Sequence, residues 1–139
     1  MFFIKRKESS ITIRSRAEGC LFTVDIAIGK KVFPNAMKCV LYKEDKNILI
    51  GDIYVCEHKS ICRKYLPYVN KGYGTQMMNE LLRFSKENGY IKITGNLSEV
   101  DQSTAYDPTH RERQIHFYKK FGFRITSSEE DPQGIELNL

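Results

Sequence analysis

The residues that most clearly suggest chemistry form a glycine loop at 70–75, with the sequence NKGYGT. The loop lies between a segment typical of a strand and an amphipathic segment typical of a helix. Alternating glycines let the backbone turn tightly and keep side chains out of the way of a ligand. Free N–H groups at the start of the following helix then favour a phosphate. The loop is neither a Walker loop, since the G-K-[ST] ending is missing, nor the dinucleotide fingerprint, since Met77 replaces its third glycine.

A second cluster, formed by Cys56, His58 and Cys62, contains residue types that bind zinc. Its spacing is not that of a usual zinc finger, and no fourth ligand is nearby. The chain also has no C-x-x-C pair. We therefore interpret the cysteines as reduced thiols on apolar strands, and we expect no metal.

The elements that would position the glycine loop follow from the hydrophobic pattern. Residues 9–66 are typical of strands, and the individual strands are predicted at 11–15, 20–28, 37–42, 48–55 and 61–66. A polar turn at 43–47 predicts a hairpin. This half of the chain therefore reads as a meander of strands.

Helices are predicted only after residue 70. The spacing of Met77, Leu81 and Phe84 predicts a helix over 75–88 that ends at Gly89, followed by a strand over 90–93. A second helix is predicted to start at Asp107-Pro108 and to end at Gly122. The segments 123–126 and 135–139 predict a final strand pair.

Length and composition suit one soluble domain, 1–139. The chain has 139 residues, of which 41% are hydrophobic and 28% charged, and this excludes wholesale disorder. No apolar run is long enough to span a membrane or direct secretion, so we expect a cytoplasmic protein with no membrane partner. The formal net charge of +5 favours an anionic partner, but does not choose between nucleic acid, a membrane surface and a phosphorylated cofactor.

Two longer segments, YVNKGYGTQMMNELLRFSKENGYIKI and IHFYKKFGF, strongly resemble the GNAT family of N-acetyltransferases. The first is similar to the family's acetyl-CoA motif, Q/R-x-x-G-x-G/A, and the second to the signature of its last helix. The resemblance extends over residues 61–125, and upstream only the strand content agrees. It implies an α/β (α+β) fold with a central mixed, mostly antiparallel sheet that is splayed at the acetyl-CoA site and flanked by helices.

The resemblance also implies where acetyl-CoA, the expected co-substrate, would bind. In the family the backbone of the glycine loop holds the CoA pyrophosphate, which here implies Val69, Asn70, Lys71, Gly72, Tyr73, Gly74 and Thr75. The strand before the loop splays from its neighbour and pairs with the pantetheine arm, which implies Leu66 near that strand's end. Asn96, after the strand at 90–93, could reach the pantetheine or the far end of the cofactor, or it could be a simple turn residue.

Two features depart from the family pattern. Val69 stands where the motif has Gln or Arg, so any side-chain contribution there is lost and the backbone N–H groups must hold the phosphates. The family usually places two helices between its first two strands, where they help to form the acceptor site. Only six residues separate Ile13 from Cys20, so we expect these helices to be missing. The acceptor amine, whether a small molecule, a peptide terminus or a lysine, stays open.

Attack of an amine on a thioester needs a neutral amine, a stabilised oxyanion and a protonated leaving thiol. The resemblance implies that Tyr118 faces the cofactor sulfur, and a phenol with a pKa of ~10 is protonated at pH 7. The alternative is that Tyr118 is a core residue beside Phe117 and Phe121. Candidates for a general base, each of which could equally be a solvated loop residue, are Glu57, His58, Glu99 and Asp101.

The sequence therefore predicts an acyltransferase that moves the acetyl group of acetyl-CoA to an unidentified amine, with Tyr118 protonating the leaving thiolate. One alternative is a non-catalytic CoA-binding domain, which Val69 and the missing helices would explain. Another is a small basic nucleic-acid-binding module, which rests on charge alone and lacks the usual RNA- and DNA-binding motifs. A homodimer is also open, because members of the family are often dimers.

Overall fold

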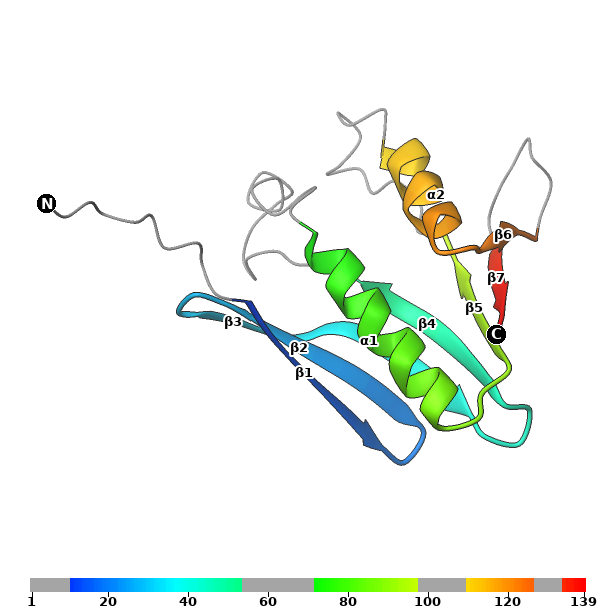
Figure 1. Ribbon diagram of the computed structural model, residues 1–139, viewed down its shortest axis with the longest axis horizontal. Coiled ribbons are helices and arrows are strands. Elements are labelled where there is room, and N and C mark those ends of the chain that lie inside the picture. The colour runs from blue at the N-terminus through cyan, green and yellow to red at the C-terminus, as the bar shows by residue number, and fades with distance from the viewer. Residues whose placement is uncertain (1–10, 54–71, 98–109, 127–133) are drawn as a thin grey trace, which may run out of the picture.

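The computed structural model describes residues 11–53, 72–97, 110–126 and 134–139 (Figure 1). In chain order these residues form β1 (Ile11–Glu18), β2 (Leu21–Ile28), β3 (Lys31–Tyr42), β4 (Asn47–Ile53), α1 (Tyr73–Glu87), β5 (Lys92–Asn96), α2 (His110–Lys120), β6 (Arg124–Ile125) and β7 (Gly134–Asn138). The predicted strand at 61–66 and the predicted start of the second helix at Asp107-Pro108 lie outside the described residues.

The strands form one sheet in the order β1-β2-β3-β4-β5-β7-β6. All neighbouring strands are antiparallel except β4 and β5, which are parallel. The prediction of a mixed, mostly antiparallel sheet is therefore confirmed. The final strand pair is also confirmed, with β7 inserted between β5 and β6.

Tight turns join the first three strands. Glu18 pairs with Leu21 and Ile28 with Lys31, so each turn has two residues, and the first of each is a glycine with positive φ, Gly19 at 57° and Gly29 at 63°. This is the geometry of a type II′ turn, whose twist matches that of the flanking strands. The connection from β1 to β2 leaves no room for a helix, as expected from the sequence.

Strand β3 is longer than predicted, because it starts at Lys31 and not at Met37. Pro34 and Asn35 in this stretch disfavour a regular strand, and the structure accommodates them with a register shift between Val24 and Ile26 of β2. Asn35 has a φ of 53°, and its N–H donates to the Asp25 carboxylate at 2.9 Å. The bulge lets the strand continue through residues that sequence patterns assign to a loop.

Helix α1 lies across one face of β1–β4 (Figure 1). It buries Met77, Met78, Leu81 and Ser85 against that face, and the ring of Phe84 stacks on Phe22 of β2 with centroids 4.4 Å apart.

The predicted end of α1 is confirmed, since Gly89 has a φ of 77°. The prediction that the next strand starts at Tyr90 is wrong. The N–H of Tyr90 still bonds to the Ser85 carbonyl at 2.9 Å, so β5 begins only at Lys92.

Helix α2 ends as predicted beside Gly122, whose φ is 96°. A Cβ built on Gly122 would lie 3.4 Å from Leu137 Cδ1, which places the end of α2 close to β7. Buried Phe123 then leads into β6. Neither α1 nor α2 in the described part of the chain is long and apolar enough to cross a membrane.

Candidate cofactor-binding and active site

The first feature of the candidate site is the N-terminus of α1. Gly72 is its N-cap in the left-handed conformation, with φ 83° and ψ 4°, and no side chain caps the helix. The first turn, which the structure describes in full, contains no acidic residue. The first N–H groups of a helix have no partner within the helix, and the helix dipole favours an anion beside them. This end of α1 can therefore bind a phosphate.

The two glycines of the loop have different structural roles. A Cβ on Gly72 would meet no described atom within 4 Å, so the requirement for glycine there is the positive φ. A Cβ on Gly74 would lie 3.3 Å from Cε1 and Cζ of Phe117 on α2. Gly74 therefore allows the ring of Phe117 to approach the first turn of α1, and this contact joins the two helices.

Lys120 brings a positive charge to the same place. Its Nζ lies 3.3 Å from Oγ1 of Thr75, and 5.9 and 5.6 Å from the ring centroids of Phe117 and Phe121. The two rings support the side chain through cation–π contacts. No described carboxylate pairs with this ammonium group. The charge is thus held beside the first turn of α1, where an anionic ligand could use it.

Tyr118 is buried, with 7% of its surface exposed. Its ring makes edge-on contacts with Phe117 and Phe123, with centroids 5.3 Å apart in both cases. The structure therefore shows that Tyr118 packs in the core, as one of the two interpretations of this residue expected. The role of Tyr118 as a proton donor stays a prediction.

The sheet opens where β4 and β5 diverge. The two strands pair from Asn47 with Lys92 to Ile50 with Gly95, and no further. Beyond that point β4 pairs only with β3, and Asn96 of β5 pairs with β7. The described part of the sheet thus opens between β4 and β5. The strand at 61–66, on which the splay is predicted, lies outside the described residues. The opening between β4 and β5 and the start of α1 lie at the same end of the sheet (Figure 1).

Gly95 marks the point of divergence. A Cβ there would lie 3.3 Å from Cδ1 and Cγ1 of Ile135 and 3.4 Å from Cβ of Ile50. A larger residue there would require the side chains of Ile135 and Ile50 to move by a few tenths of an ångström. Asn96 follows Gly95 immediately, is exposed, and lies beside the opening, and its contact with the cofactor stays a prediction.

The structure therefore brings Gly74 and Thr75 together with α2, leaves Gly72 at the open start of α1, and places Asn96 beside the divergence of β4 and β5. Tyr73 is half-buried in the first turn of α1. The other predicted site residues lie outside the described residues, namely Leu66, Val69, Asn70 and Lys71 of the cofactor site, Glu57, His58, Glu99 and Asp101 as bases, and Cys56 and Cys62 of the cysteine cluster.

Sequence reasoning missed Lys120, Phe117 as the partner of Gly74, and Gly95. The spacing of Phe117 and Lys120, three residues apart on a helix, indicates that their side chains are neighbours. The contact across to α1 has no local signal, since Gly74 and Phe117 are far apart in the sequence.

The match to a family model agrees with this geometry. The model describes an acetyltransferase (GNAT) domain and matches residues 34–125, well over half of the chain. The chain belongs to the GNAT family, and the recognition made from the sequence is confirmed. No curated protein sequence matches the chain.

Solved structures show the same fold at low sequence identity. An IAA acetyltransferase from Bacillus cereus has 17% identity and a TM-score of 0.62, and the match covers 94% of this chain and 100% of that one. A GNAT family acetyltransferase from Elizabethkingia anophelis with acetyl-CoA bound has 15% identity and a TM-score of 0.61, with 93% and 98% covered. The PaiA N-acetyltransferase from Thermoplasma acidophilum in complex with coenzyme A has 12% identity and a TM-score of 0.58. That match covers 86% of this chain and only 61% of the archaeal protein.

Proposed function

We propose that residues 1–139 act as one acetyltransferase domain that transfers the acetyl group of acetyl-CoA to an amine. One observation carries the proposal: the uncapped N-terminus of α1 lies at the same end of the sheet as the divergence of β4 and β5 (Figure 1). A phosphate site and an open strand edge at one end suit a ligand that has both a pyrophosphate and an extended amide-containing arm. The CoA complexes of the Thermoplasma and Elizabethkingia proteins support this choice of ligand.

In the proposed complex the pyrophosphate accepts hydrogen bonds from the first N–H groups of α1. The ammonium group of Lys120, already held near Thr75, adds a positive charge beside them. The pantetheine arm extends into the divergence of β4 and β5, where Asn96 is exposed. Because backbone N–H groups make most of these bonds, the binding tolerates valine at the Gln or Arg position of the motif.

In the proposed reaction the neutral amine attacks the thioester carbonyl carbon, its nitrogen releases a proton to water, and the C–S bond of the tetrahedral intermediate then breaks. The departing thiolate takes the phenolic proton of Tyr118, and water restores that proton. With pKa values of ~10 for a phenol and ~8.5 for a thiol, the transfer is uphill by ~2 kcal/mol, which a transient donor tolerates. Packing between Phe117 and Phe123 fixes the Tyr118 ring in one orientation.

The test is turnover of Tyr118→Phe, measured as free-thiol release with a panel of amines. The substitution keeps the ring and its two edge-on contacts, so the fold and the CoA affinity should barely change. The acetyl-transfer rate should fall by roughly 10²–10⁴, the usual effect of removing a positioned acid. Tyr90→Phe, which removes a hydroxyl from a tyrosine beyond the other end of α1, is the matched control.

Wild-type turnover in Tyr118→Phe would show that Tyr118 is only a packing residue of the thiol pocket. Tyr118→Ala would then cost about 3–5 kcal/mol of stability, as for other aromatic residues removed from a core. Absence of CoA binding to the wild-type chain, measured by calorimetry, would refute the whole proposal.

A second candidate, CoA binding without catalysis, is favoured by one observation. The two-residue connection from β1 to β2 excludes the helices that help to form the acceptor site in the family. Tight CoA binding without release of free thiol in the presence of any amine of the panel would support it.

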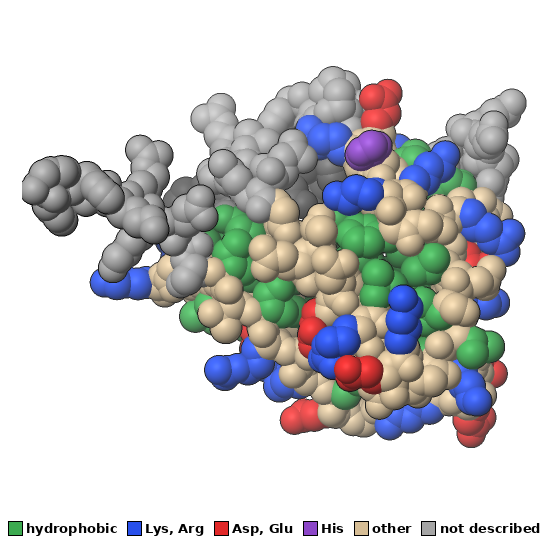
Figure 2. Space-filling view, in the orientation of Figure 1, with side chains coloured by type: hydrophobic (Ala, Val, Ile, Leu, Met, Phe, Trp, Pro, Cys, Tyr) green, Lys and Arg blue, Asp and Glu red, His purple; other side chains and the backbone are tan. Residues whose placement is uncertain are grey.

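A nucleic-acid-binding role gains little support, since Lys and Arg side chains are scattered over the face in Figure 2 and form no single patch there. The cytoplasmic location and the homodimer stay predictions from the sequence, and the identity of the acceptor amine stays open.

A further inference from the structure

Strand β1 is the edge of the sheet, and none of the residues that the structure describes pairs with its outer side (Figure 1). The strand is eight residues long, and all of its residues pair with β2 on the inner side. An unpaired edge of this length presents a row of backbone N–H and C=O groups, to which another extended chain can bond.

The register shows which backbone groups point outward. The two-residue turn makes Glu18 and Leu21 a hydrogen-bonded pair, and bonded and non-bonded pairs then alternate along an antiparallel ladder. Residues at even positions of β1 thus bond to β2. The backbone groups of Ile11, Ile13, Ser15 and Ala17 point away from the sheet.

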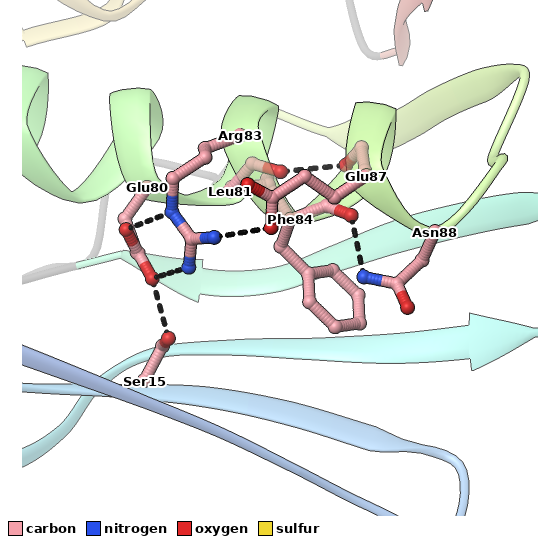
Figure 3. A network of polar contacts seen from close by, with 8 residues as sticks. Ser15, Glu80, Leu81, Arg83, Phe84, Glu87 and Asn88 are labelled. Carbon is pink, nitrogen blue, oxygen red and sulfur yellow. Dashed lines mark hydrogen bonds and ion pairs between the residues drawn. The ribbon is translucent and has the colours of Figure 1, made fainter.

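A groove of about 370 Å³ runs beside this edge, between β1 and α1. Its lining residues are Ile13, Gln76, Asn79, Glu80 and Arg83. Glu80 is already engaged, because it accepts hydrogen bonds from Arg83 and from Ser15 (Figure 3). The exposed amides of Gln76 and Asn79 make no side-chain hydrogen bond to any described residue. They can therefore bond to a chain that lies along β1.

The face of β1 that points away from the groove carries two exposed arginines, Arg14 and Arg16. Arg16 forms an ion pair with Asp25 at 2.5 Å and bonds to Asn35 at 3.2 Å. Arg14 lies opposite Asp25 in the register and attracts that carboxylate electrostatically, but its side chain forms no hydrogen bond or ion pair with any described residue. A chain added to this edge would meet one arginine that is held in an ion pair and one that is not.

These charges disfavour a second copy of the chain as the occupant. In the two antiparallel registers that pair nearly the whole of β1 with itself, the close non-bonded positions bring Arg14 opposite Arg14 or Arg14 opposite Arg16. Like charges directly opposite each other destabilise a strand pair. Acidic residues at the same positions would stabilise it.

We propose that β1 binds an extended acidic segment of another protein, which adds to the sheet as an antiparallel strand. Two acidic residues of that segment, separated by one residue, lie opposite Arg14 and Arg16. The residues between and beside them are apolar and face the groove next to Ile13. Main-chain bonds to the outward groups of β1 hold the segment, and the alternation of acidic and apolar side chains sets its specificity.

The direct test is the binding of a blocked heptapeptide, Thr-Ile-Glu-Val-Glu-Ile-Thr, followed by fluorescence anisotropy at low salt. The same peptide with lysine in place of both glutamates is the control. We expect the acidic peptide to bind at least tenfold more tightly and to lose affinity as salt is added. Equal binding of the two peptides, or no saturable binding of the acidic one, would overturn the proposal.

Two pairs of variants test the contacts separately. Arg14→Glu should weaken binding of the acidic peptide at least tenfold, while Lys43→Glu, an equal charge change in the β3–β4 turn, should leave it unchanged. Ala17→Pro removes one outward N–H group and should weaken binding about three- to tenfold. Ala17→Val keeps that N–H group and should bind like the wild type. Equal affinities within either pair would contradict the proposed geometry.

Hydrogen exchange tests the edge itself in the full chain. The amides of Ile13, Ser15 and Ala17 should exchange quickly in the free protein and slow down when the acidic peptide binds, and those of Arg14 and Arg16 should be slow throughout. Slow exchange at all five positions in the free monomer would mean that another part of the chain covers the edge, which would overturn the proposal. Sedimentation showing a dimer that Arg14→Glu strengthens would instead make a second copy the occupant.

Discussion

The two glycines of the loop should respond differently to the same substitution, because different physical constraints require glycine at each position. Gly72→Ala places a side chain on a residue with a φ of 83°, where the added Cβ has open space. The cost is therefore backbone strain alone, about 1–2 kcal/mol for an L-residue in the left-handed region. Gly74→Ala has no such strain, and alanine is up to ~1 kcal/mol better than glycine within a helix.

What offsets that gain at Gly74 is the 3.3 Å approach of the new Cβ to two carbons of Phe117. The ring must move by a few tenths of an ångström, so the net change in the free energy of unfolding should be small. Replacing the ring with a smaller side chain should remove the obstacle. In a Phe117→Leu background, Gly74→Ala should then stabilise the protein, which gives a coupling energy of about 0.5–1 kcal/mol.

Urea unfolding of the single and double variants measures these quantities, with an unchanged m-value as the check on two-state behaviour. CoA titration of the same proteins separates the local effects from the ligand site. Gly72→Ala should also reduce CoA affinity more than tenfold, since its methyl group enters the space beside the first N–H groups. Additive effects of Gly74→Ala and Phe117→Leu would refute the contact, and an unchanged stability of Gly72→Ala would refute the strained φ.

Three further outcomes are expected. Burial raises the pKa of the Cys39 thiol to about 12, so Cys39 should stay unmodified by a thiol reagent at pH 7 while exposed Cys20 reacts, as mass spectrometry of the folded protein would show. Hydrogen bonds from the neighbouring arginine and from Ser15 hold the pKa of Glu80 below its usual value, so their stabilising effect is complete above the unfolded pKa and is lost as pH falls through the folded one. Ser15→Ala should therefore cost about 1 kcal/mol at pH 7 and less at pH 3 in urea unfolding, and an equal cost at both would contradict this. Lys120→Gln should weaken CoA binding, measured by calorimetry, by only about two- to fivefold at low salt, because the ammonium group is exposed. A larger loss would contradict this prediction.

The strand meander and the end of α1 could be predicted because their signals are local. Alternating apolar residues, the polar turn at 43–47 and Gly89 each act within a few residues of where they stand. The start of β3 could not be predicted in the same way. Pro34 and Asn35 argue against a strand, and it is the tertiary contact with Asp25 of β2 that allows the bulge.

The candidate site could be predicted only in part for a similar reason. The glycine loop and Tyr118 are readable because they belong to motifs with fixed spacing. Sequence could not separate the two glycines, since the role of Gly74 depends on Phe117 in another helix. Nor could it find the divergence beside Gly95, which depends on where the pairing of β4 with β5 stops.

The insertion of β7 between β5 and β6 has a consequence for the order of folding. Strands β1 to β4 pair with one another in chain order through short turns, so these pairings can form early, whereas contacts between distant residues form slowly. On its far side β5 has only β7 as a partner, and β6 pairs only with β7 among the described strands. During synthesis one side of β5 therefore stays unpaired until β7 (Gly134–Asn138) has left the ribosome. The sheet cannot be completed before that point. A nascent chain stalled before Gly134 would expose that edge, and chaperones would be expected to recognise it.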